Sequence, residues 1–407
     1  MTGKTKAARE PGTPGKSRKP ATRAKIPRAR AAAPAAPGRA GKSGYRFRVL
    51  AINPGSTSTK IGVYDDDTCR FEETIRHSEL DLAGFTRIWD QYEFRKRTIV
   101  EALGQHGIDI RSLSAVVGRG GLLRPVVSGT YEVSKLMIDD GRTGVQGEHV
   151  ANLGPVLAFG IGWDHGIPAY MVDPPSVDEF EPLARLSGHK DMPRRSLLHA
   201  LNIRATARVA AEKMGKRLED LNLIVAHLGG GISVAPIRKG RMIDVNDGNS
   251  GGPFSPERAG AVPTMGLIDF IYDRDLSRED AKRELVGRGG LVSYLGVNSA
   301  EAVEEMIRSG NEEAKLVYEA MAYQIAKEIG AMATVLKGRV DAIILTGGMS
   351  GSKMLTGWIK ERVGFIARVE TYPGEDELQA LTLGCLRVLR GIEKAKTYPE
   401  SVDTMPL

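Results

Sequence analysis

Cysteine and long apolar runs are scarce in this sequence. Among 407 residues there are only two cysteines, Cys69 and Cys385, and neither belongs to a CxxC pair. The sequence therefore contains no pattern typical of a zinc site. So few cysteines fit a reducing, intracellular setting, and we expect a cytoplasmic protein. No apolar run approaches the roughly 20 residues that a membrane helix needs, so we expect no membrane association.

Acidic side chains are almost absent from residues 1–44, which hold 12 Lys and Arg and a single acid, Glu10. The whole chain has 57 Lys and Arg against 50 Asp and Glu, so the other residues carry 45 basic and 49 acidic side chains. The net charge of +7 therefore belongs to the N-terminal segment. The mildly acidic remainder argues against a nucleic-acid-binding body.

Residues 1–44 also contain few apolar side chains other than alanine. Such a segment cannot offset the entropy lost on ordering, and we predict a disordered basic tail. It is either a solvated tail without specific function or a weak contact for anionic polymers such as DNA or polyphosphate. It lacks the apolar core of a secretory signal, whereas a transit peptide remains an alternative because the segment is Arg-rich and acid-poor.

From Phe47 onward, strand and helix patterns alternate. Apolar runs flank a Gly/Ser/Thr turn at 47–67, which predicts a β-hairpin. The same strand–turn pattern recurs at 222–237 and at 340–352. Helices are predicted at 197–214 and at 314–336, where Val317, Met321, Ile325 and Ile329 step by four and Gly338 is a plausible stop. This alternation indicates an α/β fold with two related, hairpin-led domains and a cleft between them.

The first segment with chemical potential runs from Asn53 to Lys60, NPGSTSTK. Gly55 allows close backbone approach, the hydroxyls of residues 56–59, including Ser56 and Ser58, are donors, and Lys60 adds a cation. Such a turn can hold phosphate through backbone N–H groups, and the amide oxygen of Asn53 is a suitable Mg²⁺ ligand. It is not a P-loop, because the GxxxxGK[ST] spacing is absent and a strand follows. The alternative is an ordinary polar turn.

Two further segments are rich in glycine. In HLGGGIS, three successive glycines, Gly229, Gly230 and Gly231, follow a strand that ends near His227. An ordinary turn does not need three glycines, whereas a backbone-lined phosphate pocket does. In LTGGMSG, Gly347 and Gly348 follow the apolar run AIIL and are placed to pack against a nucleotide base or ribose. Each segment alone is also compatible with a simple turn.

Together, in this order, the three segments resemble the phosphate 1, phosphate 2 and adenosine segments of the actin-like ATPase superfamily, which includes hexokinase, Hsp70 and acetate kinase. Within it, the chain resembles the butyrate kinases of the acetate kinase group from about Phe47 to Ile392. The motifs that carry this resemblance include INPGSTSTKIGVY, VVGRGGLLRPVVSGTYEV, GEHVANLG, VDPPSVDEF, AHLGGGISV, GPFSPERAG and ILTGG.

The resemblance implies a two-domain actin-like ATPase fold, an α/β architecture with a duplicated βββαβαβα core and a nucleotide cleft between the domains. The implied domains are residues 45–200, on the carboxylate side, and 201–407, on the nucleotide side, with the C-terminal helix returning to the first. It also implies a homodimer or higher homo-oligomer.

The implied activity is reversible phosphoryl transfer between ATP and a short-chain carboxylate, with Mg²⁺, giving ADP and an acyl phosphate. A carboxylate is already ionised near neutral pH, so the nucleophile needs no general base. The site needs charge neutralisation and alignment, which favours arginines, a metal ion and hydrogen-bond donors.

The same resemblance implies roles for individual residues. Arg119 in VGRGG corresponds to a substrate-binding arginine, and Arg258 in SPERAG to a transition-state arginine. His199 in RRSLLH is expected to donate a hydrogen bond to the transferring phosphoryl group, and His149 in GEHVAN corresponds to another active-site histidine. Asp173 in VDPP corresponds to an acid that helps to hold Mg²⁺ and position an arginine.

The remaining metal-side carboxylate is expected in the segment PGEDEL, where Asp376 and Glu377 stay as alternatives beside Asn53. Four other histidines have no motif around them and are interpreted as structural: His77, His106, His165 and His189.

Substrate choice is predicted from two glycines. Acetate kinases carry bulky valines just after the substrate arginine, where this chain has Gly120 and Gly121. If these positions face the acyl tail, the missing side chains leave room for butyrate or a similar acid. An acetate or propionate kinase is the first alternative, and a non-catalytic ATP-binding scaffold of the same superfamily is the second.

Overall fold

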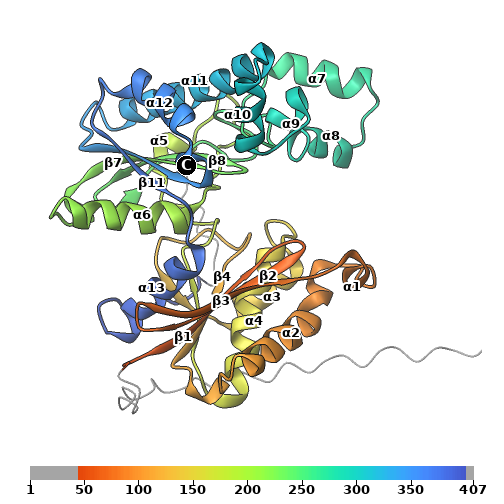
Figure 1. Ribbon diagram of the computed structural model, residues 1–407, viewed down its shortest axis with the longest axis vertical. Helices are drawn as coiled ribbons and strands as arrows, with labels where there is room; N and C mark the ends of the chain where they lie inside the picture. The colour runs from red at the N-terminus through yellow and green to blue at the C-terminus, as the bar shows by residue number, and fades with distance from the viewer. Residues whose placement is uncertain (1–44, 400–407) are drawn as a thin grey trace, which may run out of the picture. The chain divides into compact units, whose positions relative to one another are not determined.

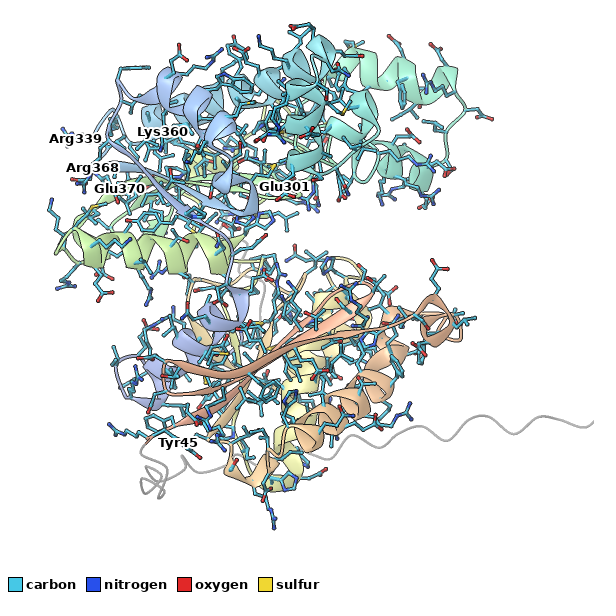
Figure 2. All side chains as sticks on the ribbon, viewed as in Figure 1. Tyr45, Glu301, Arg339, Lys360, Arg368 and Glu370 are labelled. Atoms are coloured by element: carbon cyan, nitrogen blue, oxygen red, sulfur yellow. The ribbon has the colours of Figure 1, made fainter. Side chains whose placement is uncertain are left out.

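The computed structural model describes residues 45–399. The predicted tail, residues 1–44, lies outside these residues, as does the segment 400–407. Across the described range, no helix has the combination of length and apolar character that crossing a membrane requires. Exposed charged side chains such as Arg339, Lys360 and Arg368 project from the surface of the C-terminal half (Figure 2).

The first sheet has six strands in the order β3-β2-β1-β4-β6-β5 (Figure 1). They are β1 (Arg48–Pro54), β2 (Ser58–Asp65), β3 (Thr68–Arg76), β4 (Ala115–Arg119), β5 (Thr130–Glu132) and β6 (Ala169–Val172). The predicted first hairpin is present, with β1 and β2 antiparallel and Asn53 opposite Lys60. The central strands β1, β4 and β6 are parallel and almost wholly buried, as expected for apolar runs covered on both faces.

The helices that precede residue 200 are α1 (Glu79–Leu82), α2 (Tyr92–Gln105), α3 (Lys135–Thr143), α4 (Leu153–Gly162) and α5 (Pro182–Arg185). Of these, α4 packs against β1, β4 and β6, and one of its contacts is unusually close. A Cβ atom on Gly118 would lie 2.1 Å from the carbonyl oxygen of Gly154, and one on Gly154 would lie 2.0 Å from that of Arg119. Only glycine permits α4 to approach β4 this closely, and the contact holds the end of β4, where Arg119 lies.

The second sheet has five strands in the order β11-β10-β7-β8-β9. They are β7 (Asn222–Leu228), β8 (Ile232–Arg238), β9 (Arg241–Met242), β10 (Ala342–Gly347) and β11 (Val369–Pro373). Strands β7 and β8 form the second predicted hairpin, and β7, β10 and β11 are parallel. Strand order and directions match those of β6-β4-β1-β2-β3 in the first sheet, so the core is duplicated.

The second half contains α6 (Ala200–Lys213), α7 (Thr264–Asp273), α8 (Arg278–Leu285), α9 (Gly290–Leu295), α10 (Ala300–Arg308), α11 (Glu312–Val335), α12 (Lys353–Val363) and α13 (Glu377–Leu389). The helix predicted at 314–336 is confirmed as α11, and the four residues that step by four along it are buried. Gly338 lies just beyond its end at φ +72° and donates its N–H to the carbonyl of Ala333. The helix predicted at 197–214 is α6, which begins three residues later.

The third glycine-rich segment differs from the predicted strand–turn pattern. Strand β10 ends at Gly347, and the chain continues through a short 3-10 helix, Gly348–Gly351, directly into α12. Ser352 caps α12 by accepting the backbone N–H of Leu355. A strand-to-helix connection thus replaces a hairpin, because a capping serine and helix-forming residues follow the glycines.

Helix α13, near the end of the described chain, packs against β1, β4 and β6 of the first sheet (Figure 1). Its buried face includes Leu378, Leu381 and Cys385, which share a hydrophobic cluster with Val49 and Ala51. The parallel strands β1, β4 and β6 end at Pro54, Arg119 and Val172, and β7 and β10 end at Leu228 and Gly347. Residues at such carboxyl ends commonly form the binding site of α/β proteins.

Candidate functional site

A cavity of about 350 Å³, here called the cleft cavity, is lined by residues of both halves of the core. It brings together most of the residues singled out in the sequence: Asn53, Lys60, Arg119, His199, His227, Gly230, Gly231, Arg258, Asp376 and Glu377. Glu72, Glu257, Glu375 and Leu378 complete its lining. The cavity therefore combines cationic, imidazole, carboxylate and bare-backbone groups in one place.

Arg119 is held at one side of the cleft cavity by Glu377 and Asn53. Its Nη1 atom donates to the Oε2 atom of Glu377 at 2.9 Å and lies 2.8 Å from Oε1. The same nitrogen lies 3.4 Å from Oδ1 of Asn53, whose amide nitrogen donates to Glu377. A residue from the end of β1, one from the end of β4 and one from the start of α13 thus form a single polar cluster.

The structure separates the roles of Asp376 and Glu377, which the sequence left as alternatives. Asp376 is the N-cap of α13, and its side chain accepts the backbone N–H of Gln379 at 2.8 Å. Glu377 instead directs its carboxylate to Arg119 and Asn53. Of the two, Glu377 has the stronger link to the predicted ligand Asn53, whereas one oxygen of Asp376 is committed to the helix.

His199 and His227 stack face to face, with ring centroids 3.9 Å apart and an interplanar angle of 12°. The Nδ1 atom of His199 lies 2.9 Å from Oγ of Ser233, and that of His227 lies 2.8 Å from Oδ1 of Asn202. These second bonds orient both rings, so the pair is fixed before any ligand binds.

Burial keeps both rings uncharged. Desolvation, and then the charges of Arg119 and Arg258, lower the pKa of His227 to about 3. Desolvation, followed by His227, Arg258 and Arg119, lowers the pKa of His199 well below its usual value. At neutral pH each imidazole therefore has one N–H donor and one acceptor nitrogen.

A pH dependence of stability follows from this pair. In the unfolded chain both histidines titrate near 6.5, so below that pH the unfolded state binds more protons than the native state. We expect the free energy of unfolding to fall below about pH 6.5, with His227, whose folded pKa is about 3, contributing about 1–2 kcal/mol of this loss near pH 5 and His199 acting in the same direction. Urea unfolding at pH 7 and pH 5 tests this, with His227→Gln expected to show the smaller loss. An equal loss in both proteins would contradict it.

Arg258 lies on the glycine run that follows β7. Its Nη1 atom donates to the carbonyl of Gly248 at 2.7 Å, and a Cβ atom on Gly231 would lie 2.4 Å from the same nitrogen. The third glycine therefore leaves space for the guanidinium group. A side chain on Gly229 would approach Nε2 of His227, whereas Gly230 is exposed and lines the cavity.

A buried arginine stabilises the first hairpin turn through hydrogen bonds to the backbone carbonyl groups of the turn. Arg95 of α2 is 0% exposed. Its Nη1 atom donates to the carbonyl of Ser58 and to Oγ1 of Thr59, both at 2.8 Å, and Nη2 donates to the carbonyl of Ser56 at 3.1 Å. His77, interpreted as structural, lies 2.9 Å from Oγ1 of Thr59. Lys60 lines the cleft cavity, whereas Ser56 and Ser58 do not.

Several other predicted residues lie outside the cleft cavity. His149 is exposed, and its ring accepts the N–H of Ala151 at 3.1 Å. Asp173 is buried, and its Oδ1 atom accepts Ser128 Oγ and Gly129 N, both at 2.6 Å. Asp173 lines a second, neighbouring cavity, and its φ of +38° is a conformation that non-glycine residues rarely adopt.

Gly347 and Gly348 also lie outside the lining of the cleft cavity. At φ +88°, Gly347 is required by packing, because a Cβ atom there would lie 2.4 Å from the carbonyl oxygen of Leu228. Gly348 is exposed, and a Cβ atom added there would meet no other atom within 4 Å. The first glycine allows β10 and β7 to end side by side, and the second leaves open surface.

The interpretation of Gly120 and Gly121 as spare acyl volume is wrong. A Cβ atom on Gly120 would lie 2.5 Å from Sδ of Met171 and 2.6 Å from Cβ of Pro174. One on Gly121 would lie 2.0 Å from Oδ1 and 2.5 Å from the backbone nitrogen of Asn152. A side chain at either position would point into packed protein. The two glycines therefore allow neighbouring chain segments to approach closely, and they do not open a pocket for an acyl group.

A stability prediction replaces the substrate prediction at this position. Gly121→Val is expected to destabilise the protein by about 1–3 kcal/mol, because the new side chain overlaps Asn152. Gly330→Ala in α11, where the added atom has nothing within 4 Å, is the control and is expected to be neutral or stabilising. Urea unfolding of both variants measures the difference. Unchanged stability of Gly121→Val would restore the pocket interpretation.

A metal ion at this site would need oxygen atoms of a bound substrate in addition to those of the protein. Among the described residues there is no group of three or more His, Cys, Asp or Glu side chains that could hold a metal ion. Asn53 and Glu377 nevertheless both line the cleft cavity and each has a side-chain oxygen, although in this structure Asn53 turns its amide nitrogen toward Glu377 and its oxygen toward Arg119. Mg²⁺ commonly binds through one or two carboxylates, several waters and the phosphates of a substrate, and this donor set fits that pattern.

Three acidic residues that line the cleft cavity had no predicted role. Glu375 lies 3.5 Å from Nε2 of His227, and enclosure, followed by the charge of Glu377, raises its pKa. Glu257 directly precedes Arg258 in the SPER motif, which was the one available signal for it. Glu72 lies on the edge strand β3, far from any motif, and nothing in the sequence pointed to it.

Comparison with known proteins places this geometry in context. The profile of the Acetokinase family matches residues 189–359. The structure is similar to an acetate kinase from Porphyromonas gingivalis, with 18% identity, a TM-score of 0.68 and coverage of 84% of this chain and 99% of that one. A propionate kinase from Francisella tularensis subsp. tularensis SCHU S4 gives 15% identity, a TM-score of 0.67 and coverage of 83% and 98%.

An acetate kinase from Entamoeba histolytica gives 16% identity, a TM-score of 0.66 and coverage of 83% of this chain and 98% of that one. At sequence identities this low, the TM-scores show that these proteins share a fold with this chain. The predicted actin-like ATPase architecture is confirmed: the chain has the two-sheet α/β fold of acetate and propionate kinases.

Proposed function

We propose that the protein is an ATP-dependent carboxylate kinase that transfers phosphoryl groups reversibly between ATP and a short-chain fatty acid. The observation that carries the proposal is the meeting of Arg119, Arg258 and the neutral His199–His227 pair in one cavity beside Lys60. The Acetokinase profile, which includes His199, His227 and Arg258, supports it.

The chemistry of a carboxylate acceptor suits these groups. A carboxylate attacks without losing a proton, so the site needs cations and hydrogen-bond donors but no general base. Arg119, at the end of β4, would hold the carboxylate through its planar fork once Glu377 releases it. Arg258 and the Nε2–H of His199 would face the transferring phosphoryl group, whose equatorial oxygens carry the charge in a loose transition state. The single N–H of neutral His227 is instead donated to Asn202.

Under this proposal Mg²⁺ would supply charge neutralisation of the nucleotide phosphates, and Glu377 with Asn53 would hold it. Lys60 and the backbone of Gly230 and Gly231 would contact the phosphates. Ser56 and Ser58 would act through the turn backbone that Arg95 holds. Gly347 and Gly348, at the end of β10, would lie toward the adenosine.

The preferred acid is the finer part of the proposal. We infer butyrate or another acid of three to five carbons, on the strength of the butyrate kinase-like motifs around Arg119, His149, Asp173 and Arg258. Each additional buried CH₂ contributes about 0.8 kcal/mol, so preferences of a few-fold per carbon are expected.

A substrate panel tests both parts. Purified protein is assayed with ATP, Mg²⁺ and linear and branched acids from acetate to hexanoate, with the acyl phosphate trapped by hydroxylamine. Activity that peaks between propionate and pentanoate, and that is lost in Arg258→Ala but kept in Arg339→Ala, is the expected result. Arg339 is the matched control because it is an exposed arginine that lines neither the cleft cavity nor the second, neighbouring cavity (Figure 2).

Two outcomes would change the proposal. A maximum at acetate would make the protein an acetate kinase and overturn the inference about chain length. Retained ATP binding without activity on any acid would favour the non-catalytic ATP-binding scaffold, although both arginines that such a scaffold would lack are present.

A homodimer or larger assembly in the cytoplasm is part of the same proposal. Helix α7 is apolar, yet none of its residues is buried, and Met265, Ile268 and Tyr272 are exposed. An apolar helix of this kind is a surface that an assembly would cover. Light scattering of the purified protein measures the mass, and a monomer at micromolar concentration would contradict this part.

A further inference from the structure

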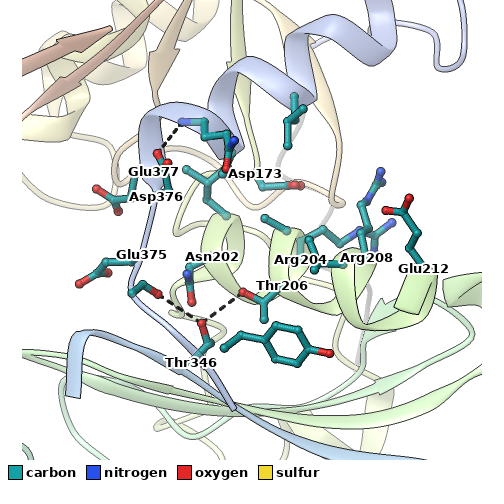
Figure 3. A pocket seen from close by; sticks show the side chains of 18 of the residues that line it. Asp173, Asn202, Arg204, Thr206, Arg208, Glu212, Thr346, Glu375, Asp376 and Glu377 are labelled. Carbon is teal, nitrogen blue, oxygen red and sulfur yellow. Dashed lines mark hydrogen bonds between the residues drawn. The ribbon is translucent and has the colours of Figure 1, made fainter. Parts of the chain in front are cut away.

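A second cavity, of about 620 Å³, lies between α6 and α13 and is separate from the cleft cavity over most of its lining (Figure 3). Its walls come from α6, from the end of β10, from the segment 372–376 and from α13. Glu72, Glu375, Asp376 and Glu377 border both cavities. Most of the other residues that line it have no role in the proposed phosphoryl transfer.

Arginines gather at the end of this cavity that is remote from Glu375 (Figure 3). Arg204 and Arg208 come from α6, Arg387 comes from α13, and Arg390 is the residue that follows α13. We call Arg204, Arg208 and Arg387 the arginine cluster. Arg390 is set apart from it, because its guanidinium group pairs with Asp66 and Asp67.

The arginine cluster has too few negative partners. A single carboxylate oxygen, Oε1 of Glu393, accepts both Nη atoms of Arg208 at 3.0 Å and Nε of Arg387 at 2.9 Å. Arg204 donates only to the carbonyl of Gly240. Within residues 45–399, Glu393 is the one carboxylate in ion-pair distance of these three arginines; Glu212 lines the same end without forming such a pair.

The cluster also shows the effects of crowded positive charge. Burial, followed by the charges of Arg387 and Arg204, lowers the pKa of Arg208, and the carboxylates of Glu393 and Asp173 offset this only in part. The Nε atoms of Arg204 and Arg208 are buried and lack a hydrogen-bond partner in the described structure. Buried donors are rarely left unpaired, and like charges this close together favour an anion as their partner.

The two helices that bear the cluster also carry groups of the cleft cavity. Helix α6 begins directly after His199, and its third residue, Asn202, orients His227. Helix α13 is capped by Asp376 and begins with Glu377, which holds Arg119. A ligand that bridges the bodies of α6 and α13 would therefore act on both histidines and on Arg119 through rigid elements.

We propose that the second cavity is a regulatory site for a small phosphorylated anion, bound by the arginine cluster. Guanidinium groups bind phosphate oxygens through paired N–H groups, and the neighbouring apolar side chains Val209, Ala380 and Leu383 can cover an organic body. The carboxylates at the far end orient the ligand, because they repel its phosphate toward the arginines.

Binding is tested first, and this test does not depend on the proposed kinase activity. The full chain, with the cleft saturated by a non-hydrolysable ATP analogue, is titrated with pyrophosphate and with glycerol phosphate by calorimetry. We expect binding that weakens roughly tenfold or more in Arg204→Gln and in Arg387→Gln. Arg339→Gln is the exposed control and should bind like the parent. All of these proteins retain residues 1–44, so contributions of that basic segment cancel.

The two probes distinguish an inorganic from an organic phosphate source, since the tighter binder shows whether the apolar wall contributes. Circular dichroism and urea unfolding confirm that the glutamine variants are folded. Binding that the ATP analogue abolishes would place the anion in the cleft and overturn the proposal. Equal affinity in the parent and in both cluster variants would overturn it as well.

Regulation is tested by initial rates at saturating ATP and acid, with and without the anion. We expect kcat or the KM for the carboxylate to change at least about twofold in the parent and in Arg339→Gln, and to stay constant in the cluster variants. Binding at the cluster without any change in kcat or KM would overturn the regulatory part of the proposal.

Discussion

Replacing Arg258 by alanine is expected to lower kcat by about two to three orders of magnitude, while the KM for ATP changes only a few-fold. Arg258 lies partly buried on Gly231, where burial lowers its pKa and removes competing water. A preorganised donor in such a site interacts mainly with the charge that develops during phosphoryl transfer. The loss should therefore appear in the chemical step more than in nucleotide binding.

Steady-state kinetics of the parent, Arg258→Ala and Arg258→Lys measure this effect. The lysine variant keeps a cation but loses the planar fork, so we expect an intermediate rate. Arg258 makes one side-chain hydrogen bond in the described structure, to the carbonyl of Gly248, so the fold should tolerate the change. If kcat stays within a few-fold of the parent, Arg258 does not act on the transition state.

Arg119→Gln is expected to raise the KM for the carboxylate by about 10- to 100-fold. A hydrogen bond to a charged group contributes about 1.5–3 kcal/mol, and the glutamine cannot supply the cation that a carboxylate needs. The variant also leaves Glu377 without its cationic partner, and the uncompensated negative charge of Glu377 at the edge of the cavity would repel the substrate. The KM for ATP should change less than the KM for the acid.

The variant Glu377→Gln, alone and combined with Arg119→Gln, separates the loss of the arginine cation from the repulsion by the unpaired carboxylate. Removal of both charges should restore part of the lost affinity for the acid, because the unpaired carboxylate is then absent. Glu377→Gln alone should raise the Mg²⁺ concentration needed for half-maximal rate if this residue is on the metal side, whereas Asp376→Asn should not. Strictly additive effects of Arg119→Gln and Glu377→Gln would show that the two residues act independently.

The anion proposed for the second cavity can also be tested in the variant Glu377→Gln. The residues of the arginine cluster lie on α6, which begins directly after His199, and on α13, which begins with Glu377. If the anion changes the carboxylate KM, the effect should vanish in Glu377→Gln, since α13 would then no longer hold Arg119. That outcome would distinguish transmission through α13 from transmission through α6.

Local sequence patterns were sufficient to predict the two hairpins and the long helix of the core. Apolar runs with a Gly/Ser/Thr turn between them predicted β1–β2 and β7–β8, because a hairpin depends mainly on neighbouring residues. The step of four from Val317 to Ile329 predicted the buried face of α11. After Gly347 local reasoning was wrong, since a second turn was expected where the chain enters α12.

The candidate site was predictable in its residue types but not in its geometry. Motif context singled out Arg119, His199, His227 and Arg258, and the structure brings these four into one cavity. The motifs could not show that Asp173 lines the neighbouring cavity or that Arg95 supports the first turn. These contacts join residues that are 36 or more positions apart along the chain, and no local pattern records them.

The sequence by itself determined the α/β class, the hairpin-led duplication and the set of charged and glycine residues from which the site is built. It could do so because strand alternation, helical spacing and turn chemistry are short-range properties. Only the tertiary structure shows that Glu377 is the carboxylate that faces Arg119 and that a side chain at position 121 would overlap packed protein. It alone also shows that arginines of α6 and α13 converge on Glu393. Those outcomes depend on the directions in which packed helices and strands place their side chains, which exist only once the chain has folded.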